Sequence, residues 1–289
     1  MNSKRIFTFG EILWDMLPSG ARFGGAPANL AFHAGQLGAE VRLISAVGND
    51  QLGINALAEM QAKGMATEWV AELNFPTGRV DVVLDQQGSA TYQFGNGQAW
   101  DAIPWKEPYA EQLGAADVFC FGTLAQRSPD SRSTLRRCLE ACGDATIRFL
   151  DLNLRRPFYD DDLIRDSIAA ANALKVNDEE FAMIAELYGI EGTDVEVAEE
   201  LTAKCNLQTL AVTFGEKGSL VWHHGESHHC PSKPVGIVDT IGAGDSYTGT
   251  LIVSLLEGLS VADANYRACR IAEYVCTQSG PAPRLPSTL

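Results

Sequence analysis

The sequence predicts an α/β protein built on a mostly parallel sheet that helices cover on both faces. Short, nearly continuous apolar runs alternate with amphipathic stretches of helical period, which is typical of strand–helix–strand units. We expect buried strands at 6–9, 41–47, 117–122, 147–152 and 209–214. We expect covering helices at 54–63, 133–141 and 179–188. Because no internal repeat or linker interrupts this pattern, we expect residues 1–289 to form a single domain.

Two regions break the alternation and look like antiparallel β-ribbons, 10–25 and 77–94. In the second region, apolar and polar residues alternate from Val80 to Leu84, Gln87-Gly88 is a predicted turn, and the strand returns through Phe94. Two such ribbons indicate a small second layer beside the parallel sheet. This layer is either a lid or a pair of edge hairpins.

The charge balance excludes whole classes of partner. The chain has 289 residues, 46% hydrophobic and 20% charged, which excludes a disordered chain. Lys and Arg total 22 against 37 Asp and Glu, a net charge of −15. So acidic a protein has no electrostatic footprint for nucleic acid or an anionic membrane. A neutral ligand such as a sugar, or a metal-bound nucleotide, fits more easily.

The cysteines and the lengths of the apolar runs indicate the cellular compartment in which the protein works. The seven cysteines are odd in number, scattered and without a Cys-x-x-Cys pair, which favours free thiols in a reducing compartment. The first apolar run stops at Glu11, and the run at 251–256 is far too short for a membrane span. We therefore expect a cytoplasmic protein.

The strongest local motif is the turn that ends in Gly242-Ala243-Gly244-Asp245. It precedes a helical pattern with Leu251 and Leu255 on one face. Small residues at a helix start leave backbone N–H groups open to an anion, and the helix dipole favours negative charge there. Asp245 would lie in the first turn, where a phosphoryl group arrives. The alternative is a tight turn in which Asp245 only caps the helix.

A second glycine turn, Gly24-Gly25, lies just before a predicted helix that begins near Pro27 and contains Asn29. Upstream, Asp15 interrupts an apolar strand. An Asp and an Asn beside two glycines are suited to hydrogen-bond vicinal hydroxyls. The alternative places Asp15 on the solvent face of an edge strand.

Together these motifs resemble the ribokinase-like carbohydrate kinase family of the phosphofructokinase-B type. The resemblance rests on ordered motifs spread over the whole chain: Gly24-Gly25-x-x-x-Asn29, Asp151-x-Asn153-x-Arg155, Asn177-x-x-Glu180, Thr213-x-Gly215-x-x-Gly218 and Asp239-Thr-Ile-Gly-Ala-Gly-Asp245. One departure is Thr250, where the family usually places Ala or Gly. The resemblance implies a three-layer α/β/α ribokinase-like fold, a nine-stranded, largely parallel sheet and a small β-lid from segments 10–25 and 77–98.

The resemblance also implies an ATP-dependent sugar kinase. Asp245 is then the general base, and the N–H groups of Gly242, Ala243 and Gly244 bind the phosphoryl anion. The remaining expected residues are Asp15, Gly25, Asn29, Phe94 and Arg155 for the sugar, Thr213, Gly215, Gly218 and Gly244 for the nucleotide, and Asn177 and Glu180 for nucleotide phosphate and Mg²⁺. A monovalent cation such as K⁺ is expected near Asp239 and Ile241.

The Ala26-Pro27-Ala28 insert and the Asp151–Arg155 run resemble fructokinases more than ribokinases, and Ala99-Trp100-Asp101 does so too. We therefore expect D-fructose as the acceptor. Ribose, 2-keto-3-deoxygluconate or a riboside are the alternatives, and a catalytically silent sugar-binding regulator is a further one. We also expect a homodimer formed through the lid.

Four of the five histidines gather in one segment, His223, His224, His228 and His229. A metal site is one interpretation of this segment. A surface hairpin turning at 225–227 is the other, because neighbouring side chains on a strand point to opposite faces and so divide the ligands.

Overall fold

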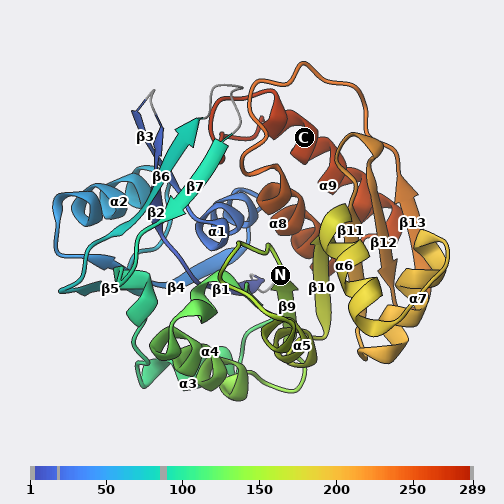
Figure 1. Cartoon of the computed structure of the whole chain (residues 1–289), viewed down its shortest axis with the longest axis horizontal. Coiled ribbons are helices and arrows are strands. Elements are labelled where there is room, and N and C mark those ends of the chain that lie inside the picture. Colours follow the sequence, from blue (N-terminus) through green and yellow to red (C-terminus); the bar gives the residue numbers. More distant parts are fainter. Residues whose placement is uncertain (1–3, 18–19, 85–89, 287–289) are drawn as a thin grey trace.

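A large sheet runs through the middle of the molecule (Figure 1). The structure is a computed structural model that describes residues 4–17, 20–84 and 90–286. Within these ranges, nine strands form the sheet. Their spatial order is β13 (Glu226–Cys230), β12 (Ser219–His223), β11 (Thr209–Thr213), β10 (Ala173–Asn177), β9 (Ile147–Asp151), β8 (Val118–Phe121), β1 (Arg5–Phe9), β4 (Glu40–Gly48) and β5 (Val70–Leu73).

Neighbouring strands from β11 to β5 pair in parallel, and only the β11–β12 and β12–β13 pairs of the described sheet are antiparallel. The five predicted strands and the largely parallel sheet are therefore confirmed. Strand β10, which carries a lysine between apolar neighbours, was not among the predicted strands. The predicted hairpin around 225–227 is confirmed as β12–β13.

Helices cover both faces of the sheet, which gives the expected three layers (Figure 1). One face carries α1 (Ala26–Gln36), α2 (Gln51–Ala62), α8 (Ala243–Leu256) and α9 (Val261–Cys276). The other carries α3 (Pro108–Leu113), α4 (Pro129–Ala141), α5 (Asp161–Ala169), α6 (Asp178–Tyr188) and α7 (Asp194–Lys204). The three predicted helices are confirmed. Helix α2 begins three residues earlier than predicted because Asp50 caps it by accepting from Gly53 N at 2.8 Å.

Alternate side chains of each strand enter different cores. Ile6 of β1 packs with Leu30 of α1 and Ile252 of α8 on one face. Phe7 of the same strand packs in a cluster with Leu135 of α4 and Ile184 of α6 on the other. The continuous apolar strands of the sequence thus reflect burial on both faces.

A second, smaller sheet confirms the two predicted ribbons. Its strand order is β3 (Gly20–Gly24), β2 (Leu13–Leu17), β6 (Gly78–Leu84) and β7 (Ala90–Phe94). Each ribbon is antiparallel, and β2 joins β6 in parallel. Since β2 lies between two strands, the alternative of Asp15 on an edge strand is wrong. The predicted Gln87-Gly88 turn lies outside the described residues.

The parallel strands end at a common edge of the large sheet, the usual ligand-binding edge of an open α/β sheet. Glu11, Thr123 and Asp151 follow or end three of these strands, and Asn177 and Thr213 end two more. The same edge faces the start of α8. Among the described helices, none is long and apolar enough to cross a membrane.

Candidate active site

Helix α8 begins at the predicted Gly-Ala-Gly turn, and its first residue is Ala243. The N-cap is Gly242, whose φ of +81° lies in the left-handed region that glycine favours. A Cβ at Gly242 would lie 2.3 Å from Pro281 O, so the turn has no room for a side chain. Ala243 N donates to Thr240 O at 3.3 Å. Within the described residues, no side chain caps this helix.

Asp245 occupies the third position of α8 and does not act as its cap, so the capping alternative is wrong. Its Oδ2 accepts a hydrogen bond of 2.8 Å from Asn29 Nδ2 of α1. Asn29 is 4% exposed, and its Oδ1 is buried with no hydrogen-bond partner among the described residues. A buried acceptor without a donor is costly. The amide beside Asp245 is therefore ready to receive a hydroxyl.

Burial raises the pKa of Asp245 to about 6, and the nearby Asp151 carboxylate adds to the rise. The hydrogen bond from Asn29 and the charges of Lys175 and Arg155 act in the opposite direction. Desolvation therefore outweighs the helix N-terminus, which favours the ionised carboxylate. A pKa of about 6 still leaves the carboxylate mostly ionised at pH 7, which suits a general base.

An ion pair lies beneath the turn. Lys175 Nζ is 3.2 Å from Asp151 Oδ1, and Thr248 Oγ1 of α8 donates to Asp151 Oδ2 at 2.9 Å. Burial alone would lower the pKa of Lys175, but the carboxylates of Asp151, Glu180 and Asp245 hold it above its usual value. A Cβ at Gly244 would lie 3.2 Å from this ammonium group. The turn thus has a buried positive charge directly behind it.

Two further carboxylates face the same space. Burial raises the pKa of Glu11 to about 7, and its Oε1 accepts from Ala26 N at 3.2 Å. Burial also raises the pKa of Asp15 to about 6. The Arg155 guanidinium, on an exposed residue, lowers the pKa of both and of Asp245. The structure therefore brings Asp15 and Asp245 within electrostatic range of Arg155, and Asn29 contacts Asp245.

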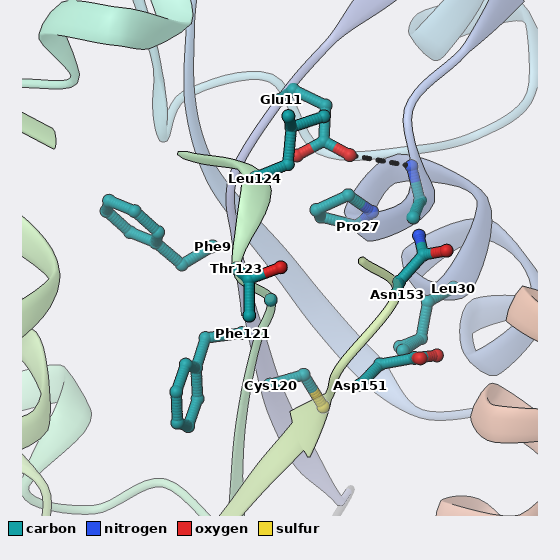
Figure 2. A pocket seen from close by; sticks show the side chains of 12 residues that line it. Phe9, Glu11, Pro27, Leu30, Cys120, Phe121, Thr123, Leu124, Asp151 and Asn153 are labelled. Carbon is teal, nitrogen blue, oxygen red and sulfur yellow. Dashed lines mark hydrogen bonds between the residues drawn. The ribbon is translucent and has the colours of Figure 1, made fainter. Parts of the chain in front are cut away.

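Figure 2 shows a small recess between the ends of strands β8 and β9 and the start of helix α1. Asp151 and Asn153, at the end of β9, face Pro27 and Leu30 of α1, and Cys120 of β8 lies below. Its volume is about 30 Å³, which corresponds to about one water molecule.

Two other residues that the resemblance assigns to the sugar are held by close contacts. Gly25 is the N-cap of α1 with a φ of +113°, and a Cβ there would lie 2.3 Å from Glu11 O. Phe94, at the end of β7, packs edge-to-face on Phe158 with ring centroids 5.7 Å apart. Since Phe158 follows Arg155 closely in the chain, the small sheet contacts the loop that carries this arginine.

The predicted nucleotide residues lie at the ends of β10 and β11, where Asn177 pairs with Thr213. Asn177 caps α6 by accepting from Glu180 N at 2.8 Å, and Glu180 Oε2 accepts from Asn177 N at 2.9 Å. Glu180 Oε1 accepts from Leu154 N at 2.7 Å. Burial raises the pKa of Glu180, whereas Lys175 lowers it.

Two glycines shape the loop after β11. Gly215 (φ +57°) and Gly218 (φ +103°) are both in conformations that L side chains rarely adopt. A Cβ at Gly218 would lie 1.9 Å from Cys230 O, so this loop closes tightly on β13. The loop is open on its outer side at Gly215, where a Cβ would meet no atom within 4 Å.

The histidine segment is a hairpin, and its strand register and hydrogen bonds divide the four histidines. Strand register pairs His228 with Val221 and His229 with Leu220. His223 Nδ1 lies 2.8 Å from Thr209 Oγ1, and His228 Nδ1 lies 3.3 Å from Asn265 Nδ2. Among the described residues, no group of three His, Cys, Asp or Glu could hold a metal ion.

The comparisons with known proteins agree with this geometry. The family model described as pfkB family carbohydrate kinase matches residues 20–288. The chain belongs to this family. It is accordingly a carbohydrate kinase, and its fold and motifs are those that the resemblance implied.

Curated relatives of this carbohydrate kinase include fructokinases. The chain is 32% identical to the fructokinase of Klebsiella pneumoniae over 279 residues, covering 88% of this chain and 85% of the relative. It is 26% identical to the fructokinase of Solanum tuberosum over 312 residues, covering 99% and 94%.

Solved structures show the same fold across different acceptors. The 2-dehydro-3-deoxygluconokinase of Thermotoga maritima superposes with a TM-score of 0.86 at 22% identity, covering 98% of this chain and 96% of that one. The fructokinase of Xylella fastidiosa with bound ATP gives 0.83 at 20% identity, covering 97% and 94%. A fructokinase of Vibrio cholerae O395 bound to fructose, ADP and potassium gives 0.81 at 21%, covering 98% and 95%.

Sequence reasoning missed three charged residues around the site: Glu11, Arg22 and Lys175. Each is a single charged residue in an apolar or ribbon segment, with no local spacing to mark it. One signal in the sequence could have found Lys175. It is the lone lysine in the short segment Ala173–Asn177, where its neighbours on both sides are apolar. A buried lysine needs a carboxylate partner, and that partner is 24 residues away in the chain.

Proposed function

We propose that the protein is a fructokinase that transfers the γ-phosphoryl group of ATP to a hydroxyl of D-fructose. The observation that carries the proposal is the Asn29–Asp245 pair in front of the uncapped start of α8. The unpartnered Asn29 Oδ1 accepts from a sugar hydroxyl, and Asp245 lies beside it as the base. The N–H groups of the Gly242-Ala243-Gly244 turn bind the phosphoryl oxygens, and Ala243 N gives up its 3.3 Å hydrogen bond to Thr240 O to do so.

These groups account for every bond and proton in the phosphoryl transfer. The attacking hydroxyl gives its proton to the Asp245 carboxylate while its oxygen forms the new bond to the γ-phosphorus. The bond from the γ-phosphorus to the bridging oxygen breaks, and ADP leaves with that electron pair. The protein contributes position, a base and a preorganised set of donors. Lys175 adds a positive charge behind Gly244.

The charges favour a neutral sugar over an acidic one. Glu11, Asp15 and Asp245 face the acceptor space, and Arg155 is the one cation that lowers the pKa of all three. An acceptor that carries its own carboxylate, such as 2-keto-3-deoxygluconate, would meet three acidic side chains against the guanidinium groups of Arg155 and Arg22, and Arg22 is already paired with Asp239. Fructose brings hydroxyls alone, which carboxylates accept readily. The identity to the Klebsiella pneumoniae fructokinase supports the same acceptor.

Mg²⁺ would arrive with the nucleotide and be reached through its water molecules, because both Glu180 oxygens already accept backbone N–H groups. Mg²⁺ usually keeps several waters and binds one or two carboxylates plus substrate phosphates. Glu180 and Asn177 would hold its water shell near the end of β10, and the bound ion would neutralise phosphate charge. Thr213, Gly215 and Gly218 would lie along the nucleotide.

The test is ADP release from the purified protein with MgATP and a panel of D-fructose, D-ribose, 2-keto-3-deoxygluconate and a riboside. We expect the highest kcat/KM with fructose and little ADP release without sugar. Equal or better kcat/KM with ribose would contradict fructose as the acceptor. ADP release that no sugar stimulates would favour the silent-regulator alternative.

The sugar contact of Asp15 has its own test. Asp15→Ala removes a charged acceptor, and such a hydrogen bond is worth roughly 1.5–3 kcal/mol, or about 10- to 150-fold in kcat/KM for sugar. The KM for ATP should barely change. Unchanged sugar kinetics would remove Asp15 from the site.

We also propose that the small sheet acts as a lid and pairs two copies of the chain. Its outer strands β3 and β7 each leave one edge unpaired within the described sheet, and such edges can pair with another chain. Light scattering should give twice the mass of one chain. A monomer at micromolar concentration would contradict the pairing.

A further inference from the structure

One ion pair joins the small sheet to the turn in front of α8. Arg22 Nη1 of β3 lies 2.5 Å from Asp239 Oδ2, and the two residues are 217 positions apart in the chain. The side chains are 33% and 13% exposed, respectively. The contact is therefore partly shielded from water, and it bridges two parts of the molecule that the sequence keeps far apart.

Asp239 uses its carboxylate to hold the turn together. Its Oδ1 accepts from Ile241 N at 3.0 Å, and its Oδ2 accepts from Gly280 N at 3.2 Å. Gly242 packs directly on Pro281 of the same C-terminal segment. The position of this one carboxylate thus fixes the backbone that leads into the Gly242-Ala243-Gly244 turn.

Arg22 also faces the sugar side of the site. In the register of the β2–β3 pair it lies opposite Asp15. Its charge lowers the pKa of Asp15, while Asp239 raises it. The guanidinium therefore lies between the carboxylate that we assign to the sugar and the carboxylate that holds the phosphate-binding turn.

We propose that Arg22 is a positioning residue that orders the phosphate-binding turn through Asp239 and takes the place of a free monovalent cation there. The Asp239 carboxylate already receives two N–H groups and a guanidinium, and a second cation beside that guanidinium would be repelled. This inference rests on the proposed phosphoryl transfer. If Arg22 orders the turn, the phosphate-binding turn is ordered only while strand β3 keeps Arg22 next to Asp239. The kinase should then not need K⁺ for activity.

The kinetic test compares Arg22→Ala and Arg22→Lys with the native protein, each in KCl and in tetramethylammonium chloride at equal ionic strength. The native protein should turn over at the same rate in both salts. Arg22→Ala should lose about tenfold or more in kcat in tetramethylammonium, as expected for a lost charge-assisted contact. K⁺ or millimolar guanidinium should restore part of that rate, and Arg22→Lys should retain most of it.

A matched control is Arg79→Ala. Arg79 is also an arginine of the small sheet and pairs with Asp81, but both side chains are about half exposed, at 51% and 46%. This variant should keep native kcat in both salts. Loss of activity in Arg79→Ala equal to that in Arg22→Ala would mean that the small sheet is merely sensitive to charge removal, and would overturn the proposal.

Hydrogen exchange gives a readout that does not depend on turnover. Arg22→Ala without K⁺ should exchange faster than the native protein at 239–244, and K⁺ should restore protection. Unchanged exchange at these residues, or native kcat in Arg22→Ala, would overturn the proposal. Activation of the native protein by K⁺ would overturn it as well. If no sugar is phosphorylated at all, the proposed function fails, and exchange still decides the role of Arg22.

Discussion

Two helices of this protein carry an acidic residue at their third position and use it differently. In α6, the N-cap Asn177 and the third residue Glu180 form a reciprocal pair of hydrogen bonds with each other's backbone. In α8, the third residue is again acidic, Asp245, but the N-cap is Gly242. The α6 start is closed by its own side chains, whereas the α8 start is left to a ligand.

The difference lies in a single residue type. Glycine has no side chain to accept an N–H bond, and its left-handed conformation at Gly242 turns the chain sharply into α8. Asp245 is thereby released from capping and instead pairs with Asn29 of another helix. The acid at the third position is held by its own helix in α6, where a polar cap precedes it, and pairs with another helix in α8, where glycine does.

Asp245→Asn should have the largest effect. Asn keeps the acceptor for Asn29 Nδ2 but cannot take a proton, and loss of a general base typically costs about 10²- to 10⁴-fold in rate. Steady-state ADP release with sugar measures kcat, and the KM for ATP should stay close to native. If the variant retains most of the native kcat, the α8 start supplies no catalytic base and the contrast with α6 fails.

The stability of that variant provides its control. Because burial raises the pKa of Asp245 to about 6, the ionised carboxylate destabilises the fold above pH 6, and this cost vanishes below about pH 4, where folded and unfolded chains are both protonated. Asp245→Asn should therefore melt no lower than the native protein at pH 7. A lower melting temperature would show that its lost activity reflects misfolding.

Lys175→Met should come next, because this ammonium serves both helix starts. It pairs with Asp151, and its charge lowers the pKa of Asp245 and of Glu180. Removing one partner of a buried pair leaves the other charge unpaired, at a cost of about 3–5 kcal/mol in unfolding free energy. Denaturant unfolding measures this. The double variant with Asp151→Asn should recover much of the loss, and no recovery would contradict the pair as its origin.

The smallest effect is expected at the start of α6. Asn177→Ala removes a cap worth about 1 kcal/mol, a shift of a few degrees in melting temperature, while Asn177→Asp keeps the cap and serves as the matched control. Both should retain far more activity than Asp245→Asn. If Asn177→Ala loses over a hundredfold in kcat at native stability, α6 is also open to chemistry and the two helix starts are alike.

Most of the fold was predictable from local pattern. Strands such as Ile147–Asp151 are buried on both faces, so their apolar runs carry the signal directly. Both glycine turns were predictable because glycine and proline act through local backbone geometry. Strand β10 was missed because Lys175 interrupts its apolar run, and only the distant Asp151 explains how a lysine can be buried there.

The electrostatics of the site could not be predicted from the sequence. The pKa of Asp245 depends on burial beneath α1 and on the Asp151 carboxylate, which only the folded chain brings close. The Arg22–Asp239 pair likewise joins two segments that share no spacing pattern. Local motifs in the sequence identify ionisable side chains near the site. Their protonation depends on tertiary contacts, which those motifs do not show.

The most direct test of Asp245 as the base is the ratio of native to Asp245→Asn kcat/KM for sugar, measured from pH 5 to pH 8. Asp15 titrates in this range in both proteins and cancels in the ratio, whereas Glu11, whose pKa the Asp245 charge raises, adds a smaller change of its own. Because Asp245 is protonated below its pKa of about 6, the ratio should rise with pH and level off above that value. A ratio near one at every pH, or one that falls as the pH rises, would contradict the mechanism.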